Sequence, residues 1–212
     1  MSILNEISEN LQKGKAKIVK ELVQQAIDEG IPAKEILSDG LLSGMDIIGE
    51  KFKNNEDFVP EVLVAARAMN MGMALLKPYM ADCGIEPAGT AVIGTVRGDM
   101  HDIGKNLVKM MIEGKGLRVV DLGVDVSPEK FLEAAEENHA DIICCSALLT
   151  TTMGEIKNIL AYLEARNVRG KYKVMIGGAP VSQSYCDAIG ADYYTPDAAS
   201  AADVAYRICR QA

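Results

Sequence analysis

The chain has 212 residues, enough for one large domain or two small ones, and 49% of them are hydrophobic, enough for a substantial core. The formal net charge of −8 argues against nucleic-acid binding through a basic face. We expect no signal peptide and no membrane partner, because the start lacks a basic segment and no apolar run reaches spanning length. Five cysteines without a Cys-x-x-Cys pair indicate reduced thiols in a cytoplasmic protein.

About the first 80 residues predict helices only. Apolar residues keep helical spacing over 4–11 and again over 18–27. A third helix is predicted over 32–52, and a fourth over 60–78, with a proline in the first turn of each and Pro78 closing the last. Four amphipathic helices with short joints predict a small bundle that forms a domain of its own, residues 1–87.

Beyond a linker at 82–89, strand and helix signals alternate, which predicts a second domain at 88–212. The strands are short and apolar without alternation, as in a parallel sheet covered on both faces. Five such units fit an α/β, flavodoxin-like or Rossmann-like doubly wound fold of strand order 2-1-3-4-5. The predicted strands are 90–96, 118–122, 141–146, 173–176 and 191–194, and the predicted helices are 103–114, 128–138, 153–167, 180–189 and 197–210.

The segment most suggestive of chemistry follows the first of these strands and runs from Gly98 to Gly104. It places His101 on a glycine-bounded loop, where a ring nitrogen can project toward a metal. Asp99, two residues earlier, can hold the other nitrogen and so set the tautomer. The chain has only two histidines, so a metal bound here must bring most of its own ligands, as a macrocyclic cofactor does.

Two further loops are predicted to border the same slot. Ligands of such sheets bind beyond the carboxyl ends of the strands where the strand order reverses, here between the first and third strands. The loop after the third strand carries Ser146, Leu148 and Thr150, and a hydroxyl at Ser146 could extend a hydrogen-bonded line from His101 through Asp99. Gly177 and Gly178 after the fourth strand would let the backbone approach a ligand closely.

Each feature alone has an ordinary structural reading. A single histidine is more often a surface residue than a ligand, and Asp99 and Asp102 could simply cap a helix. The dinucleotide fingerprint G-x-G-x-x-G and the P-loop are both missing, which argues against NAD and ATP. The combination of three loops at one sheet edge favours a cofactor site.

The motifs resemble those of cobalamin-binding domains. The segment 99–104 matches the family's D-x-H-x-x-G, Ser146-Ala147-Leu148 matches its S-x-L, and Gly177-Gly178 matches its G-G, all in the same order. The helical half, at 44–52 and 58–61, resembles the cap of methionine synthase and of corrinoid methyltransferase proteins. The chain is most similar to the small corrinoid proteins of anaerobic methyltransferase systems.

This resemblance implies a role for each matched residue. Cobalamin, as methylcobalamin or cob(I)alamin, would bind with its own base displaced, and His101 would replace that base as the lower axial ligand of cobalt. Asp99 and Ser146 would form a relay that adjusts the proton on His101. The corrin and its nucleotide tail would lie near the other matched loop positions, with Phe52, Val59 and Val62 of the helical cap sheltering the upper face. Those loop positions are Gly98, Met100, Asp102, Ile103, Gly104, Leu148, Thr150, Gly177, Gly178 and Ala198.

The implied activity is that of a methyl carrier and not of a complete enzyme. A substrate-specific methyltransferase would load the methyl group, a second one acting on a thiol or tetrahydrofolate would unload it, and a reductive activase would rescue oxidised cobalt. Three alternative functions remain beside this one. A cobalamin-dependent sensor would need a DNA-binding segment, a mutase subunit would lack the helical cap, and a signalling domain would need a cluster of acidic phosphoacceptors.

Overall fold

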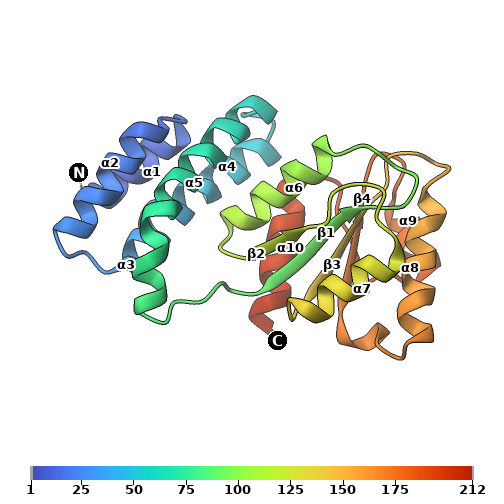
Figure 1. The fold of residues 1–212 in the computed structure, drawn as a ribbon. Coiled ribbons are helices and arrows are strands. Elements are labelled where there is room, and N and C mark those ends of the chain that lie inside the picture. The colour runs from blue at the N-terminus through green and yellow to red at the C-terminus, as the bar shows by residue number, and fades with distance from the viewer. Residues whose placement is uncertain (1, 212) are drawn as a thin grey trace. The chain divides into compact units, whose positions relative to one another are not determined.

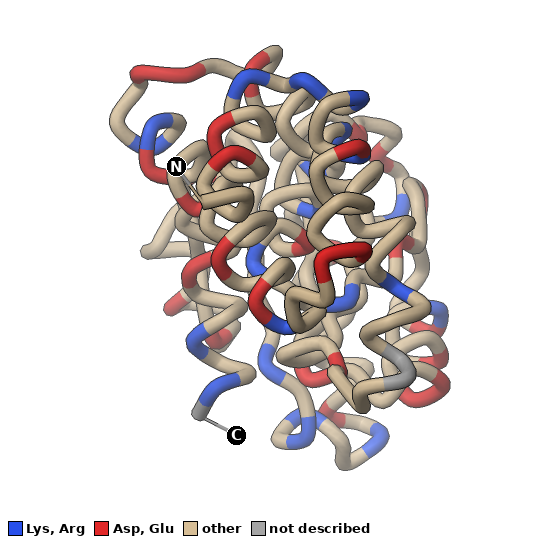
Figure 2. The backbone as a smooth tube through the Cα atoms, turned by 90° about the vertical axis from the view of Figure 1, so that its left-hand side faces the viewer, with Lys and Arg blue, Asp and Glu red and all other residues tan. Residues whose placement is uncertain are grey.

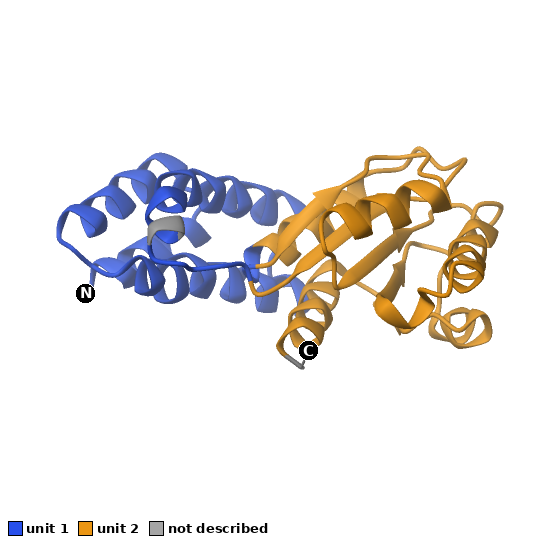
Figure 3. Cartoon of the chain, turned by 60° about the horizontal axis from the view of Figure 1, so that its bottom comes forward, with its two compact units in different colours: residues 1–87, 114–116 blue, residues 88–113, 117–212 orange. Residues whose placement is uncertain are grey.

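The computed structural model describes residues 2–211, without the side chains of Ala81, Asp82 and Gln211. The chain divides into two compact units, coloured separately in Figure 3. Unit 1 comprises residues 1–87 and 114–116, and unit 2 comprises residues 88–113 and 117–212. Lys and Arg are interspersed with Asp and Glu along the chain (Figure 2). The 30 acidic residues outnumber the 22 basic ones.

Unit 1 is helical, as predicted, because each helix buries one apolar face. Ile7, Leu11 and Val23 are fully buried, and α5 packs against α2. The predicted third helix is one continuous helical run over 33–53, whose middle part is π-helical. The elements are α1 (Ile3–Gln12), α2 (Ala16–Asp28), α3 (Ala33–Glu35), η1 (Ile36–Leu42), α4 (Ser43–Lys53) and α5 (Val59–Asp82).

The last helix of unit 1 corrects two expectations. Pro78 does not close α5, which continues to Asp82. A proline inside a helix removes its own amide hydrogen bond and crowds the carbonyl four residues earlier, but the helix can continue beyond it: Cys83 N–H donates to the Tyr79 carbonyl at 3.2 Å. The stretch 59–80 is also long and apolar enough to cross a membrane by length and composition alone. In the structure 39% of the most apolar 18-residue window of this stretch is buried, and α5 packs against α2.

Unit 2 contains a five-stranded parallel sheet of order β2-β1-β3-β4-β5 (Figure 1), which confirms the predicted topology. Ser127 accepts a hydrogen bond from Lys130 N–H at the start of α7, so the predicted N-cap followed by Pro128 is also confirmed. The fifth strand is shorter than predicted. The elements are β1 (Thr90–Thr95), α6 (Ile103–Gly114), β2 (Arg118–Asp121), α7 (Pro128–Glu137), β3 (Ile142–Ser146), α8 (Met153–Ala165), η2 (Arg169–Lys171), β4 (Lys173–Gly177), α9 (Gln183–Ile189), β5 (Tyr193–Tyr194) and α10 (Ala198–Gln211).

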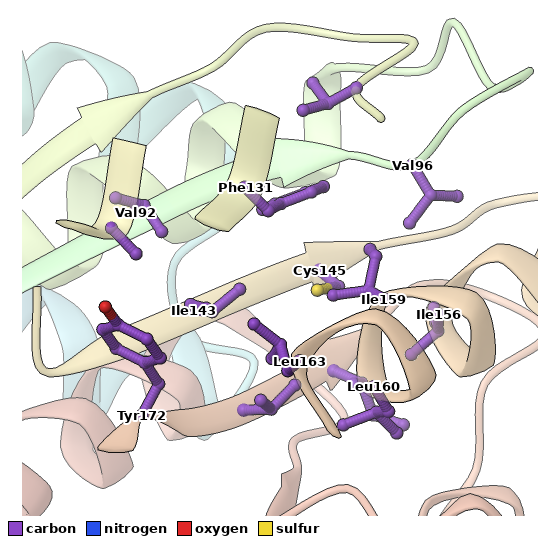
Figure 4. Close-up of a cluster of buried hydrophobic side chains, with 14 of the residues drawn as sticks. Val92, Val96, Phe131, Ile143, Cys145, Ile156, Ile159, Leu160, Leu163 and Tyr172 are labelled. Carbon is purple, nitrogen blue, oxygen red and sulfur yellow. The ribbon is translucent and has the colours of Figure 1, made fainter. Parts of the chain in front are cut away.

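The sheet is covered by buried side chains on both faces. Val92, Ile143 and Cys145 belong to a core cluster with residues of α7 and α8, part of which Figure 4 shows. Their neighbours Ile93 and Cys144 are also buried but lie outside that cluster, because successive side chains of a strand point to opposite faces. Both faces are apolar, so the strands carry continuous apolar runs and their polar residues are confined to the ends.

Candidate cofactor site

Three loops meet at the carboxyl edge of the sheet. Thr95, Ser146 and Gly177 are the last residues of β1, β3 and β4, and they are direct neighbours in the register. The loop after β1 carries Asp99 and His101. The parallel pairing therefore brings together loops that are far apart in sequence, as the strand order predicted.

Asp99 is the centre of the hydrogen-bond network at this edge, and its side chain is fully buried. Its Oδ1 atom lies 2.7 Å from His101 Nδ1 and accepts the His101 backbone N–H at 3.1 Å. Its Oδ2 atom accepts the backbone N–H groups of Leu148 and Leu149 at 2.7 and 3.3 Å. The Thr152 hydroxyl donates to the same oxygen at 2.8 Å. One carboxylate thus joins the loops after β1 and β3.

These hydrogen bonds decide the charge of Asp99. Burial by itself would raise the pKa of Asp99, but the donors from His101, Leu148 and Thr152 outweigh it and hold that pKa well below its usual range. The carboxylate is therefore ionised at neutral pH and acts only as an acceptor. It follows that His101 Nδ1 carries a proton toward Asp99 and that a neutral imidazole keeps its free electron pair on Nε2.

His101 is held by its main chain while its ring faces outward. Its side chain is 51% exposed, although Asp99 beside it is fully buried. The buried Thr95 hydroxyl donates to the His101 carbonyl at 2.7 Å, which fixes the loop against the end of β1. The geometry therefore presents a fixed imidazole of defined tautomer to whatever ligand covers this edge.

The hydroxyl that reaches Asp99 is not the one predicted. Within residues 2–211, Ser146 is not among the donors to Asp99, and Thr152 takes that place. The turn after β3 folds back, with Thr152 N–H donating to the Leu149 carbonyl at 3.1 Å, so the Thr152 side chain returns to the buried carboxylate. Three consecutive threonines after Leu149 were the available signal. The role of Ser146 toward a ligand stays a prediction.

The two predicted ligand-facing glycines of the β4 loop differ in what they do. Gly178 has a φ of 126°, and a Cβ atom there would overlap the Ala147 carbonyl oxygen. Gly178 is therefore required by the close approach of the β3 and β4 loops themselves. Beside Gly177 the nearest atom to an added Cβ would be the Thr195 carbonyl oxygen at 3.7 Å, so space remains there.

Large apolar side chains around His101 are exposed. Met100 is 70% exposed, Ile103 78% and Leu149 41%. A Cβ atom added at Gly104 would meet nothing within 4 Å. Apolar surface of this kind around a single imidazole fits a flat, largely apolar ligand that covers the loop edge.

Charged residues anchor the first turn of α6 behind this surface. Lys105 is 3% exposed, and its Nζ lies 2.6 Å from Asp121 Oδ1, an ion pair that the sequence reasoning missed. Asp102 is exposed, and its carboxylate accepts the Asn106 side-chain N–H at 3.2 Å, a pair of side chains one turn apart at the start of α6. A contact of Asp102 with a ligand stays a prediction.

The remaining predicted ligand contacts lie in varied environments. Thr150 is exposed in the β3 loop, and Ala198 is 5% exposed at the start of α10. In unit 1, Phe52 and Val59 are half-buried, whereas Val62 is fully buried, so its side chain has no surface to offer a ligand in this structure. The most exposed aromatic side chain of unit 1 is that of Phe58, at 63%.

The donor set itself limits what the site can bind. Across residues 2–211 no three His, Cys, Asp or Glu side chains come together in a group that could hold a metal ion. One imidazole with a free Nε2 can supply a single ligand. The residues therefore fit a metal that arrives inside its own macrocycle, as the cobalt of cobalamin does.

Comparison with known proteins agrees with this geometry. Residues 89–204 match one B12 binding domain family, and residues 3–77 match a second one. A corrinoid protein of Desulfitobacterium hafniense is 43% identical over 211 residues, which are 98% of each chain. Trimethylamine corrinoid protein 1 of Methanosarcina acetivorans is 42% identical over 91% of this chain and 88% of its own.

A solved structure extends the match to three dimensions. The methanol:cobalamin methyltransferase complex of Methanosarcina barkeri contains a chain with a TM-score of 0.88 and 30% identity, covering 99% of this chain and 80% of that one. The fold and the matched domains thus define a cobalamin-binding protein. The chain belongs to the family of corrinoid proteins that combine a helical and an α/β B12-binding domain, and cobalamin is its cofactor.

Proposed function

We propose that the chain is a methyl carrier in which His101 Nε2 would hold the cobalt of cobalamin while Asp99 holds the other ring nitrogen. The observation that carries this proposal is the buried, ionised Asp99 carboxylate 2.7 Å from Nδ1 of a half-exposed imidazole. Bound cobalamin supplies the cobalt centre that accepts and releases the methyl group.

The residues of this chain contribute position and proton control. Asp99 keeps the proton on Nδ1, which leaves Nε2 free and makes the imidazole a stronger donor. Thr152 and the Leu148 N–H stabilise the charge of Asp99, so the carboxylate does not take up that proton at neutral pH. A rise in the electron demand on His101 can then be met by a stronger hydrogen bond from Nδ1–H to the charged carboxylate, without transfer of the proton.

The proposal includes three partner proteins, and the methanol:cobalamin methyltransferase complex of a relative supports the first of them. A substrate-specific methyltransferase would load the methyl group, a second methyltransferase would pass it to a thiol or tetrahydrofolate, and a reductive activase would restore the reactive cobalt. The names of the relatives, trimethylamine corrinoid protein and methanol:cobalamin methyltransferase complex, indicate which donors to try first. We propose a small methylated amine or methanol as the donor class.

Labelling the histidines tests the axial ligand directly. Protein grown with 15N-histidine is loaded with cobalamin, reduced to cobalt(II) and examined by EPR. If His101 ligates cobalt, the nitrogen splitting changes from the 14N to the 15N pattern, because the cofactor's own base is unlabelled. Persistence of the 14N pattern would overturn the proposal.

The two histidines of the chain provide a matched pair of variants. His101→Ala should abolish the 15N pattern and weaken cobalamin retention. It should also slow methyl transfer from trimethylamine or methanol in an assay with the substrate-specific methyltransferase. His139→Asn should change none of these, because His139 is exposed and asparagine tolerates its φ of 51°. Equal behaviour of the two variants would remove His101 from the mechanism.

A further inference from the structure

One residue outside the matched motifs contacts the histidine loop at two points, once through its side chain and once through its backbone. Asp125 lies in the loop after β2, and its carboxylate Oδ1 accepts the Gly98 N–H at 2.7 Å. Its own backbone N–H donates to the Asp99 carbonyl at 3.1 Å. Asp125 therefore holds both residues of the Gly98–Asp99 segment by their main-chain groups.

The segment that Asp125 holds is a tight turn at the start of the site. Asp99 N–H donates to the Val96 carbonyl at 3.1 Å, and Gly98 has a φ of 77°, as the third residue of a type II turn requires. In such a turn the Gly98 N–H has no partner within the turn itself. Asp125 supplies that partner and so fixes the direction in which the chain enters Asp99.

Asp125 is itself held in a conformation that few residues adopt. Its φ is 54°, in the left-handed region that aspartate, asparagine and glycine tolerate. The next residue, Val126, forms a parallel bridge with Val96, and its N–H donates to the Thr95 carbonyl at 3.0 Å. Before Asp125, the Gly123 carbonyl accepts the Thr95 N–H at 3.0 Å, so the β2 loop is anchored on both sides of Asp125 and can act as a rigid support.

We infer that Asp125 is a positioning residue for the axial histidine, which acts by clamping the Gly98–Asp99 segment from the loop after β2. Asp125 touches only the main chain of that segment, so it acts through Asp99 and His101. The inference rests on the proposed function, because it assigns to Asp125 a part in presenting His101 to cobalt. If the turn loosens, the Asp99 carboxylate and the imidazole lose their fixed orientation, and the cofactor must order them when it binds.

Two substitutions separate the hydrogen bond from the charge and from the backbone conformation. Asp125→Gly keeps the left-handed conformation and removes the acceptor of the Gly98 N–H. Asp125→Asn keeps both the conformation and an acceptor oxygen and removes only the charge. Asn167→Gly is the matched control, because Asn167 is exposed after α8 with a similar φ of 58°.

The first readout uses the protein without cofactor. Amide hydrogen exchange, measured by NMR, should show the Gly98 N–H protected in the wild type although Gly98 is exposed. In D125G its exchange should accelerate by roughly tenfold or more, while D125N and N167G keep the protection. An unprotected Gly98 amide in the wild type would overturn the clamp whatever the variants do.

The second readout is the dissociation constant for hydroxocobalamin, with melting curves to confirm that each variant is folded. D125G should bind about 3- to 10-fold more weakly, the effect of one lost hydrogen bond, and D125N and N167G should stay within about twofold of the wild type. Equal affinity of D125G and wild type, or an equal loss in D125N, would overturn the inference. If the wild type shows no 15N-histidine pattern while hydrogen exchange of the Gly98 N–H is still faster in D125G, the proposed function fails and the role of Asp125 in holding the turn stands.

Discussion

Replacing Asp99 with asparagine tests whether the buried carboxylate sets the tautomer of His101. Asparagine keeps the size of the side chain but offers one acceptor oxygen and one NH₂ donor. Three donors converge on Oδ2, from Leu148, Leu149 and Thr152, at 2.7, 3.3 and 2.8 Å. We expect the amide oxygen to face these three donors, which leaves the NH₂ group facing His101.

In that orientation the NH₂ group donates to Nδ1, so the imidazole proton must move to Nε2. The nitrogen that is proposed to bind cobalt then loses its free electron pair. The His101 backbone N–H, which donates to the carboxylate in the wild type, then loses its acceptor. The contact at Nδ1 changes from a charge-assisted to a neutral hydrogen bond. At ~1.5 kcal/mol for the lost bond and ~0.5 kcal/mol for the weakened one, the free energy of unfolding should fall by about 2 kcal/mol.

NMR of 15N-histidine-labelled protein without cofactor reports the tautomer, and urea denaturation reports the stability. Thr152→Val is the control, because it removes one donor to Asp99 but keeps the carboxylate. It should cost about 1 kcal/mol and leave the proton on Nδ1. If D99N keeps the proton on Nδ1, or if T152V moves it as well, the carboxylate does not control the tautomer and the reasoning is refuted.

Three further predictions concern stability, each measured by chemical or thermal unfolding. Gly178→Ala should destabilise by about 3 kcal/mol or more, because a Cβ atom would overlap the Ala147 carbonyl at a positive φ, whereas Gly170→Ala, with nothing within 4 Å, should be near neutral. A small effect at Gly178 would show that the two loops separate easily. Tyr172→Phe should be neutral or stabilise by about 1 kcal/mol, since the buried Tyr172 hydroxyl has no hydrogen-bond partner among the described residues; a clear loss would reveal a partner for that hydroxyl. The pKa of Asp99 is lower in the folded state, so its contribution is fully present above the unfolded value of ~4 and is lost as pH falls below it. The wild type should therefore lose more stability than D99N below pH ~4, and parallel curves would contradict the assigned direction.

Much of the fold could be predicted because it depends on local patterns. The helical spacing of apolar residues before residue 80 and the short apolar strands after residue 89 are properties of neighbouring positions. Alternating strands and helices allow few parallel topologies, so the strand order followed as well. Asp99 and His101 are two residues apart on one loop, and their contact could be expected for the same reason.

Contacts between segments that are distant in the sequence could not be predicted from such local patterns. The donor to Asp99 is Thr152, 53 residues further on, and the choice between Thr152 and Ser146 depends on how the turn after β3 folds back. Gly178 looked like room for a ligand, but its backbone packs against Ala147. The Asp125 clamp comes from the neighbouring strand and carries no motif of its own.

The sequence by itself determined which residues form helices and strands and which loop carries the imidazole, because those properties depend on a few successive side chains. Only the tertiary structure decided that the Thr152 hydroxyl donates to Asp99, that Gly178 packs against Ala147, and that the Asp125 carboxylate holds the turn before Asp99. Hydrogen bonds require placement within a few tenths of an ångström, and for groups from separate loops that placement is set by the packing of the whole sheet.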